Sequence, residues 1–198
     1  MIKAVLLDAD GVVLKSAEKM FSRRLKDEYQ IEIPLIFWKE VYPQVRLGKA
    51  SLKEELRKRI KNWGWPRSVE ALLNYWWTPQ NKPNLRVLEL VKRLKTRGIK
   101  CYLASDNNQY RARLLMKGAL GQIFNKGFFS CYLGCVKEDK EFYQAVFKET
   151  KLKPEEILFV DDEKENVQAA QKMGLRTHFY QDFKAFEKES IPILKGDI

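Results

Sequence analysis

The stretch Lys3-Ala-Val-Leu-Leu-Asp8-Ala-Asp10-Gly11-Val-Val13 decides how this 198-residue chain folds. Its apolar residues predict a buried strand of a parallel sheet, and two acids and a glycine follow that strand at once. Ligands meet an open α/β sheet at the carboxyl ends of its strands. Carboxylates near a core are costly unless something pairs with them. A cation and a phosphate ester at this strand end would pair with Asp8 and Asp10; the alternative is a solvated acidic turn, which is common after a strand.

Length and composition indicate a globular protein with a full hydrophobic core, either one domain or one domain with an insertion. The first apolar run is too short for a signal peptide and is interrupted by Asp8, and no stretch reaches the roughly 20 apolar residues of a membrane span. Cys101, Cys131 and Cys135 are odd in number and form no CxxC pair. They favour reduced thiols in a cytoplasmic protein that does not contact a membrane.

The chain carries 37 basic and 26 acidic residues, a formal net charge of +11. Much of the positive charge lies in segments such as Lys53–Lys61, where solvated helix faces explain it. Attraction of an anionic substrate or a nucleic acid is the alternative explanation. Since no nucleic-acid motif accompanies the charge, we expect the chain to bind a small molecule and not a nucleic acid. We expect the protein to be a monomer or a homodimer.

Strands and helices alternate along most of the chain, which predicts a doubly wound, Rossmann-like α/β fold with a parallel sheet. The predicted strands cover residues 2–7, 99–104, 128–132, 156–160 and 176–180. A helix over 84–97 ends at Gly98, and another covers 138–149.

The interval between the first and second strands contains helical patterns only. They cover residues 20–29, 35–45, 52–63 and 69–77. This is too long for a crossover, so we predict a small helical cap domain over 15–82 and a core domain made of 1–14 and 83–198. All five tryptophans fall in the cap, where most of them should form its apolar core.

Four polar clusters fall at or just after the ends of predicted strands. They are Asp8/Asp10, Ser105-Asp106-Asn107, Lys137, and Asp161/Asp162 with Asn166. Parallel strands bring such ends to one edge of the sheet, so these clusters should converge. Carboxylates suit Mg²⁺, while a hydroxyl and an ammonium suit phosphate oxygens.

In these clusters the chain resembles the haloacid dehalogenase-like (HAD) hydrolase superfamily over essentially its full length. Asp8-Ala-Asp10-Gly11-Val12 looks like the first family motif, Ser105 the second and Lys137 the third. The stretch from Phe159 to Gly174, with Asp161, Asp162 and Asn166, looks like the fourth. The helical insertion is similar to the small α-helical cap of the sugar-phosphate phosphatase branch, which includes the phosphatase domains of epoxide hydrolases.

The resemblance implies an enzyme that hydrolyses phosphoric monoesters with Mg²⁺. Asp8 would attack phosphorus and form an aspartyl-phosphate, and Asp10 would transfer protons. Mg²⁺ would be held by Asp8, the main-chain carbonyl of Asp10 and Asp162, with Asp161 acting through water. Ser105 and Lys137 would bind phosphate.

Other residues at these strand ends would act less directly. Asn166 would position neighbouring groups, Gly11 would allow the tight turn after the first strand, and Asn107 would lie beside the substrate. Family members that cleave carbon–halogen bonds lack an acid at the position of Asp10, so the resemblance favours phosphoryl transfer over dehalogenation.

Two positions depart from the family pattern. The branch usually has Asn where this chain has Asp106, a carboxylate that would repel a phosphate dianion unless it is protonated, paired or turned away. Asp106 could face solvent or cap the next helix, change substrate preference, or impair catalysis. Glu138 replaces a frequent proline at a helix start, where an acid is also suitable.

Several functional alternatives stay open at this level. The leading expectation is hydrolysis of a small phosphorylated metabolite such as a sugar phosphate. A phosphomutase, a regulatory protein that binds phosphate esters without turnover, and a phosphatase of nucleic-acid ends share the same motifs or charge. The lone His178 lies in the last predicted strand and is expected to be a packing residue.

Overall fold

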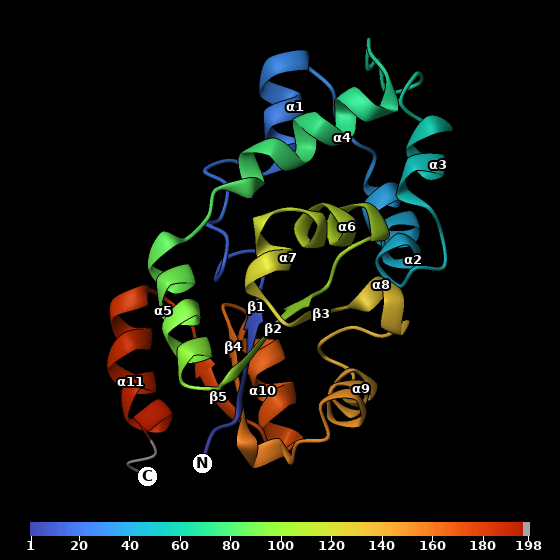
Figure 1. Cartoon of the computed structure of the whole chain (residues 1–198). Helices are drawn as coiled ribbons and strands as arrows, with labels where there is room; N and C mark the ends of the chain where they lie inside the picture. The colour runs from blue at the N-terminus through green and yellow to red at the C-terminus, as the bar shows by residue number, and fades with distance from the viewer. Residues whose placement is uncertain (196–198) are drawn as a thin grey trace.

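Five parallel strands form the central sheet of the chain (Figure 1). A computed structural model describes residues 1–195 and gives the strand order β3-β2-β1-β4-β5. The strands are β1 (Ala4–Asp8), β2 (Lys100–Ser105), β3 (Lys126–Phe129), β4 (Ile157–Asp161) and β5 (Arg176–Phe179). Every neighbouring pair is parallel, so the carboxyl ends share one edge. The predicted doubly wound α/β class is confirmed.

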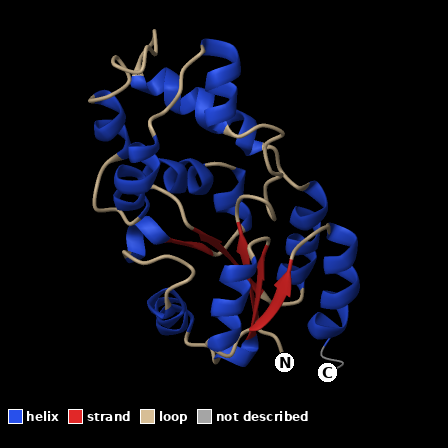
Figure 2. Ribbon diagram, turned by 180° about the vertical axis from the view of Figure 1, so that it is seen from behind, coloured by secondary structure: helices blue, strands red, loops and turns tan. Residues whose placement is uncertain are grey.

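Helices cover both faces of this sheet (Figure 2). One face carries α5 (Leu85–Thr96), α6 (Gln109–Lys117), α7 (Ala119–Ile123) and α11 (Phe183–Lys195). The other carries α9 (Lys140–Thr150) and α10 (Lys164–Lys172). The short α8 (Ser130–Leu133) follows β3, and a 3-10 turn, η3 (Pro154–Glu156), precedes β4.

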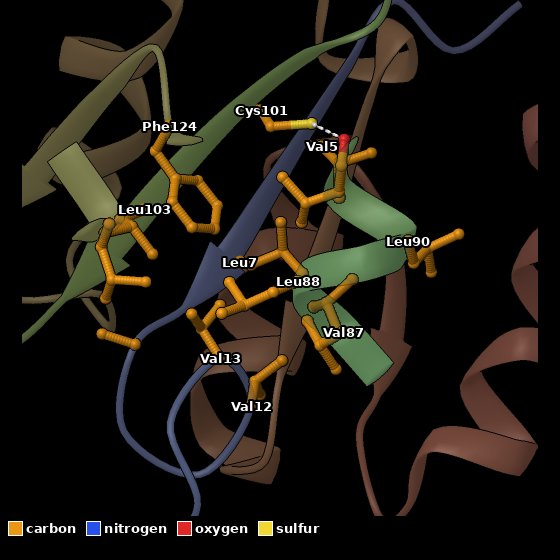
Figure 3. Packing of buried hydrophobic residues seen from close by; sticks show 14 of the residues in the cluster. Val5, Leu7, Val12, Val13, Val87, Leu88, Leu90, Cys101, Leu103 and Phe124 are labelled. Carbon is orange, nitrogen blue, oxygen red and sulfur yellow. Dashed lines mark hydrogen bonds between the residues drawn. The ribbon is translucent and has the colours of Figure 1, made fainter. Parts of the chain in front are cut away.

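The apolar residues of β1 alternate between these two faces. Val5 and Leu7 belong to the cluster that contains Val87 of α5 (Figure 3), while Leu6 belongs to the cluster that contains Phe142 of α9. All five residues are buried. The alternation explains why every apolar position in this run is needed: a central strand covered on both faces has no solvent side.

Residues 15–82, here called the helical unit, contain helices and turns but no named strand. Its elements are α1 (Phe21–Tyr29), a π-helical turn η1 (Phe37–Val41), α2 (Tyr42–Arg46), α3 (Leu52–Arg57), α4 (Val69–Trp77) and a 3-10 turn η2 (Thr78–Asn81). The unit has its own apolar cluster, which includes Leu25, Phe37, Leu56, Leu73 and Trp76. Figure 1 shows α1 and α4 beyond the carboxyl ends of the strands.

The structure changes three of the predicted elements. The strand predicted at 128–132 covers Lys126–Phe129, because Ser130 already begins α8 and its hydroxyl donates to the carbonyl oxygen of Arg46, 2.8 Å away. The helix predicted over 52–63 ends at Arg57, after which Arg59 and later residues form looser turns.

The third change lies in the predicted helix 35–45, which is divided into η1 and α2. Pro43 has no amide hydrogen and cannot donate to the residue four positions earlier. The wider π turn just before it accommodates this missing bond.

The remaining expectations from the sequence can be placed on the same fold. His178 is buried in β5 beside Phe186, with ring centroids 5.1 Å apart, as expected of a packing residue. Within residues 1–195, no helix has the length and apolar character to cross a membrane.

Candidate active site

A closed turn after β1 holds Asp8 and Asp10 at the carboxyl edge of the sheet. The amide of Gly11 donates to the carbonyl oxygen of Leu14 at 2.8 Å, and the amide of Leu14 donates to that of Ala9 at 2.8 Å. Gly11 adopts φ +106°, a conformation that residues with a side chain rarely adopt. The turn leaves Asp8 buried at the strand end and exposes 35% of the Asp10 side chain.

Lys137 joins two of the predicted acids. Its Nζ lies 2.5 Å from Oδ1 of Asp8 and 2.7 Å from Oδ2 of Asp161. The Lys137 side chain is only 4% exposed, so the ion pairs are shielded from water. Burial opposes the charge on Lys137, but the carboxylates of Asp8, Asp161 and Asp106 outweigh this effect and raise its pKa. Lys137 is therefore a fixed cation between two strand ends.

Several acids surround Lys137, and burial disfavours their charged forms. Burial raises the pKa of Asp8 well above its usual value; Lys137 opposes this effect, and Asp161 adds to it. Burial and the neighbouring Asp161 raise the pKa of Asp162 to about 6. A cation bound between Asp8 and Asp162 would remove this repulsion.

Asp161 is held by three donors. Besides Lys137, the amide of Glu163 donates to its Oδ1 at 2.9 Å and Nδ2 of Asn166 donates to the same oxygen at 3.2 Å. The Nδ2 of Asn166 also donates to a carboxylate oxygen of Glu163 at 2.9 Å. Asn166 thus contacts the acid that holds Lys137 and does not line the cavity described below.

The Asp162 carboxylate lies against the β1 turn. A Cβ atom placed on Gly11 would lie 2.1 Å from Oδ2 of Asp162. The absence of a side chain at Gly11 therefore creates the space that the Asp162 carboxylate occupies beside the main chain of Asp10. Carboxylate and main-chain carbonyl oxygens, such as those of Asp8, Asp162 and Asp10, are the kind of ligand that Mg²⁺ takes.

These oxygen atoms do not by themselves complete a metal-binding site. In the part of the chain that the structure describes, no three His, Cys, Asp or Glu side chains are grouped as a metal site. Lys137 contacts Asp8 and Asp161, while Asp162 reaches over Gly11. The chemistry of these residues fits a metal, and the remaining ligands would come from water or substrate, which is usual for Mg²⁺.

Ser105 and Asn107 stand next to the two acids of the β1 turn. Nδ2 of Asn107 donates to Oδ2 of Asp10 at 2.9 Å and to Oγ of Ser105 at 3.0 Å. Ser105 is the last residue of β2, and both residues are buried. The sequence predicts Asn107 beside the substrate. It does not reveal that Asn107 also orients Asp10.

Asp106 neither caps a helix nor faces open solvent. Its two carboxylate oxygens accept the main-chain N–H of Lys137 at 3.1 and 3.2 Å, and Asn108 caps α6 in its place. Burial raises the pKa of Asp106 to about 6, although Lys137 and Arg46 lower it. Of the three alternatives for Asp106, the one in which it faces solvent or caps a helix is therefore wrong. The carboxylate instead fastens the loop that carries Lys137.

A cavity of about 650 Å³ opens over these groups. Its floor is formed by Asp8, Asp10, Ser105, Asp106, Asn107 and Lys137. The wall above this floor comes from the helical unit and is rich in aromatic rings. It contains Phe21, Trp38, Tyr42, Trp76 and Trp77, with Met20, Arg46 and Gln80 beside them. The cavity therefore has a polar floor and a largely apolar wall, and the helical unit supplies the wall.

A family model for haloacid dehalogenase-like hydrolases matches residues 2–174. The chain belongs to this family. The resemblance inferred from the sequence is thus confirmed, and this HAD-family chain is an enzyme of the hydrolase class. The matched range includes the four motif segments, and the fold brings the ends of β1, β2 and β4 to one edge of the sheet.

Two relatives that match most of this HAD-family chain are named as phosphatases. A sesquiterpene phosphatase of Aspergillus oryzae is 29% identical over 87% of this chain and 87% of its own length. A D-ribitol-5-phosphate phosphatase of Bacteroides thetaiotaomicron is 24% identical over 99% of this chain and its full length. A solved HAD-family enzyme from the same bacterium, in complex with magnesium and inorganic phosphate, matches with TM-score 0.75 and 22% identity over 94% and 99% of the two chains.

One buried charge near the site has no counterpart in the sequence predictions. Arg111 of α6 is fully buried, and a guanidinium nitrogen lies 2.6 Å from Oδ1 of Asp10. In the sequence it looks like another basic residue of an amphipathic helix, between Tyr110 and Ala112. Neither helical spacing nor a motif marks it, because its partners lie far away along the chain.

Proposed function

We propose that this HAD-family hydrolase is a Mg²⁺-dependent phosphatase that releases inorganic phosphate from a small phosphorylated metabolite. One observation carries the proposal: Asp8, Asp10, Ser105 and Lys137 line the same floor of one cavity. The phosphatase names of the relatives and the magnesium and phosphate bound by a structural neighbour support it.

Asp8 is the proposed nucleophile. Its carboxylate forms a bond to phosphorus while the bond to the ester oxygen breaks, which gives an aspartyl-phosphate and a leaving alcohol. Asp10 donates a proton to that leaving oxygen. It then takes a proton from the water that attacks the aspartyl-phosphate, which restores Asp8 and yields phosphate.

The remaining polar residues hold the transferred group. Ser105 donates its hydroxyl, and Lys137 its ammonium, to phosphate oxygens. Mg²⁺ would be held by Asp8, the main-chain carbonyl of Asp10 and Asp162, and when bound it supplies positive charge that offsets the phosphate and the acids. Asp161 and Asn166 keep Lys137 in place.

The aromatic wall favours a substrate whose organic part is partly apolar. Trp38 and Tyr42 are half-buried and line the cavity, where their rings provide apolar contact surface. The hydroxyl groups of a sugar would instead require many hydrogen-bond partners. Together with the predicted sugar phosphates, we therefore propose aryl and isoprenoid monophosphates as candidate substrates. The name of the Aspergillus oryzae relative is consistent with the second group.

A phosphate-release assay tests the proposal. The chain is incubated with Mg²⁺ and a panel of sugar, isoprenoid, aryl and nucleotide phosphates, with Asp8→Asn as the control. Phosphate release above that control is expected and should stop when a chelator removes Mg²⁺. No turnover of any ester would overturn the proposal, and tight binding without turnover would then favour a regulatory protein. A rearranged sugar phosphate without free phosphate would identify a phosphomutase.

A further inference from the structure

Arg111 connects the proposed proton-transfer residue to the helical unit. It lies on α6, in the core of the fold, and none of its surface is exposed. One guanidinium nitrogen donates to Oδ1 of Asp10 at 2.6 Å and to the carbonyl oxygen of Gln80 at 3.0 Å. The other donates to the side-chain oxygen of Asn81. Gln80 and Asn81 belong to η2, the segment that returns the chain to the core.

An aromatic stack extends this connection into the helical unit. The guanidinium carbon of Arg111 lies 4.8 Å from the centroid of a Trp77 ring. Trp77 stacks on Trp76 with centroids 4.7 Å apart, and Trp76 stacks on Phe21 at 4.2 Å. All three rings also line the cavity, so a substrate that contacts this wall contacts a stack that reaches Arg111 through Trp77.

The environment of Arg111 leaves the Asp10 carboxylate little freedom. A fully buried guanidinium requires a charged partner, and Asp10 supplies it. Arg111 holds Oδ1 of Asp10 while Asn107 holds Oδ2 at 2.9 Å, so both oxygens have a fixed donor. A planar, forked guanidinium fixes such an orientation better than a flexible ammonium can.

We propose that Arg111 is a positioning residue for proton transfer by Asp10 and that it links this carboxylate to η2 of the helical unit. The proposal rests on the proposed function, since it assumes that Asp10 protonates the leaving oxygen. Removing Arg111 frees the carboxylate to rotate and separates it from the wall that the substrate contacts. A misplaced acid slows the departure of a poor leaving group and has little effect on a good one.

Two esters separate this role from a merely structural one. An alkyl phosphate such as glycerol phosphate needs a proton on its leaving oxygen, whereas p-nitrophenyl phosphate leaves as a stable anion. The readout is the ratio of kcat/KM for the alkyl ester to kcat/KM for the aryl ester. Each kcat/KM covers substrate binding and the steps up to cleavage of the ester bond, and it excludes the later hydrolysis of the aspartyl-phosphate. Loss of fold or of phosphate binding lowers both values and leaves this ratio unchanged.

The variants are Arg111→Met and Arg111→Lys, with Arg113→Met, an exposed arginine of the same helix, as the matched control. We expect Arg111→Met to lower the ratio about tenfold or more, a part of the roughly 10²- to 10⁴-fold that proton transfer contributes. Arg111→Lys should recover part of the loss, and Arg113→Met should change nothing. Combined with Asp10→Asn, Arg111→Met should add little further change in the ratio.

A milder variant keeps the test decisive if Arg111→Met folds poorly. Asn81 is exposed, so Asn81→Ala removes one contact to Arg111 without opening the core. It should lower the same ratio about two- to fivefold. An unchanged ratio in the folded Arg111 variants and in Asn81→Ala would overturn this inference while leaving the phosphatase proposal intact. A wild-type chain that releases no phosphate from any ester would instead overturn the proposed function.

Discussion

The ammonium of Lys137 lies 2.5 Å from a carboxylate oxygen of Asp8, across 129 residues of chain. The same ammonium holds Asp161, so one cation fixes the ends of β1 and β4 from the loop before α9. A pair buried this deeply is costly to break, because removing one partner leaves a charge without compensation.

Replacing Lys137 should therefore reduce both stability and turnover. We expect Lys137→Met to lower the free energy of unfolding by about 3 kcal/mol in the absence of Mg²⁺, since Asp8 and Asp161 remain buried without their cation. Phosphate release should fall to the level of Asp8→Asn. Urea unfolding measures the first effect, with Lys140→Met on the exposed side of α9 as the control. A loss below about 1 kcal/mol would show that the acids do not depend on this lysine.

Asp106 should make the stability of the chain depend on pH. Burial raises its pKa in the folded chain to about 6 from the usual 3.8, so the folded state binds a proton that the unfolded state releases. Its contribution to stability is thus present below about pH 4 and is lost as the pH rises through 6. The variant Asp106→Asn has no carboxyl group to ionise at this position, so it should not lose stability in this way as the pH rises.

Urea unfolding at about pH 4.5 and pH 7.5 checks the sign of this effect. Relative to wild type, Asp106→Asn should be more stable at the higher pH, and its advantage should shrink at the lower one. Glu89→Gln, an exposed acid on α5, serves as the control and should show no such change. An advantage for Asp106→Asn that grows toward acid pH would contradict the prediction.

The sheet and the floor of the cavity could be predicted from the sequence because their signals are local. The run before Asp8 and the run before Asp161 are apolar, end in acids and lie on neighbouring parallel strands, so their ends meet. The strand after residue 125 was misplaced, because a short apolar run such as 128–132 fits a strand or a buried helical turn equally well. There, the buried Ser130 bonds to Arg46 of the helical unit, a contact that no local pattern reveals.

The sites of contact between the core and the helical unit could not be predicted. Arg111 and Asp10 are 101 residues apart, and the contact between Arg111 and η2 depends on how the helical unit lies on the core. The aromatic wall has the same origin: helical spacing predicts that the tryptophans are buried, but which of them faces the cavity depends on how α4 and η1 pack.

The aromatic wall predicts that Trp38 contributes to substrate affinity. It is half-buried on η1 and faces the cavity, with its ring 5.6 Å from that of Trp76. For an aryl or isoprenoid phosphate, Trp38→Ala should raise KM about tenfold, the equivalent of about 1.4 kcal/mol of lost ring contact. Inhibition by inorganic phosphate should stay unchanged, because the proposed phosphate ligands Ser105 and Lys137 lie on the floor of the cavity.

Trp63 provides the matched control for this substitution. It is also half-buried and packs against Phe37, with ring centroids 5.1 Å apart, but it does not line the cavity. Trp63→Ala should therefore affect stability without changing KM. Equal effects of the two substitutions on KM would mean that the wall acts only through the fold of the helical unit.

The absence of a side chain at Gly11 should affect how tightly Mg²⁺ is bound. A Cβ at this position would lie 2.1 Å from the carboxylate oxygen of Asp162, so Gly11→Ala must push that carboxylate away from the β1 turn. It also forces a side chain onto φ +106°, which costs about 1–3 kcal/mol. We expect Gly11→Ala to raise the Mg²⁺ concentration needed for half-maximal phosphate release at least about tenfold, as for the loss of a charged ligand.

Gly98→Ala separates the loss of the ligand from backbone strain. Gly98 also has a positive φ, +80°, but a Cβ there meets nothing within 4 Å. Both substitutions should lower stability because both backbones are strained, whereas only Gly11→Ala should shift the Mg²⁺ titration. The stabilisation of the folded chain by added Mg²⁺, read as the rise in Tm, gives the same comparison without turnover. If Gly11→Ala and Gly98→Ala respond to Mg²⁺ alike, Asp162 is not one of its ligands.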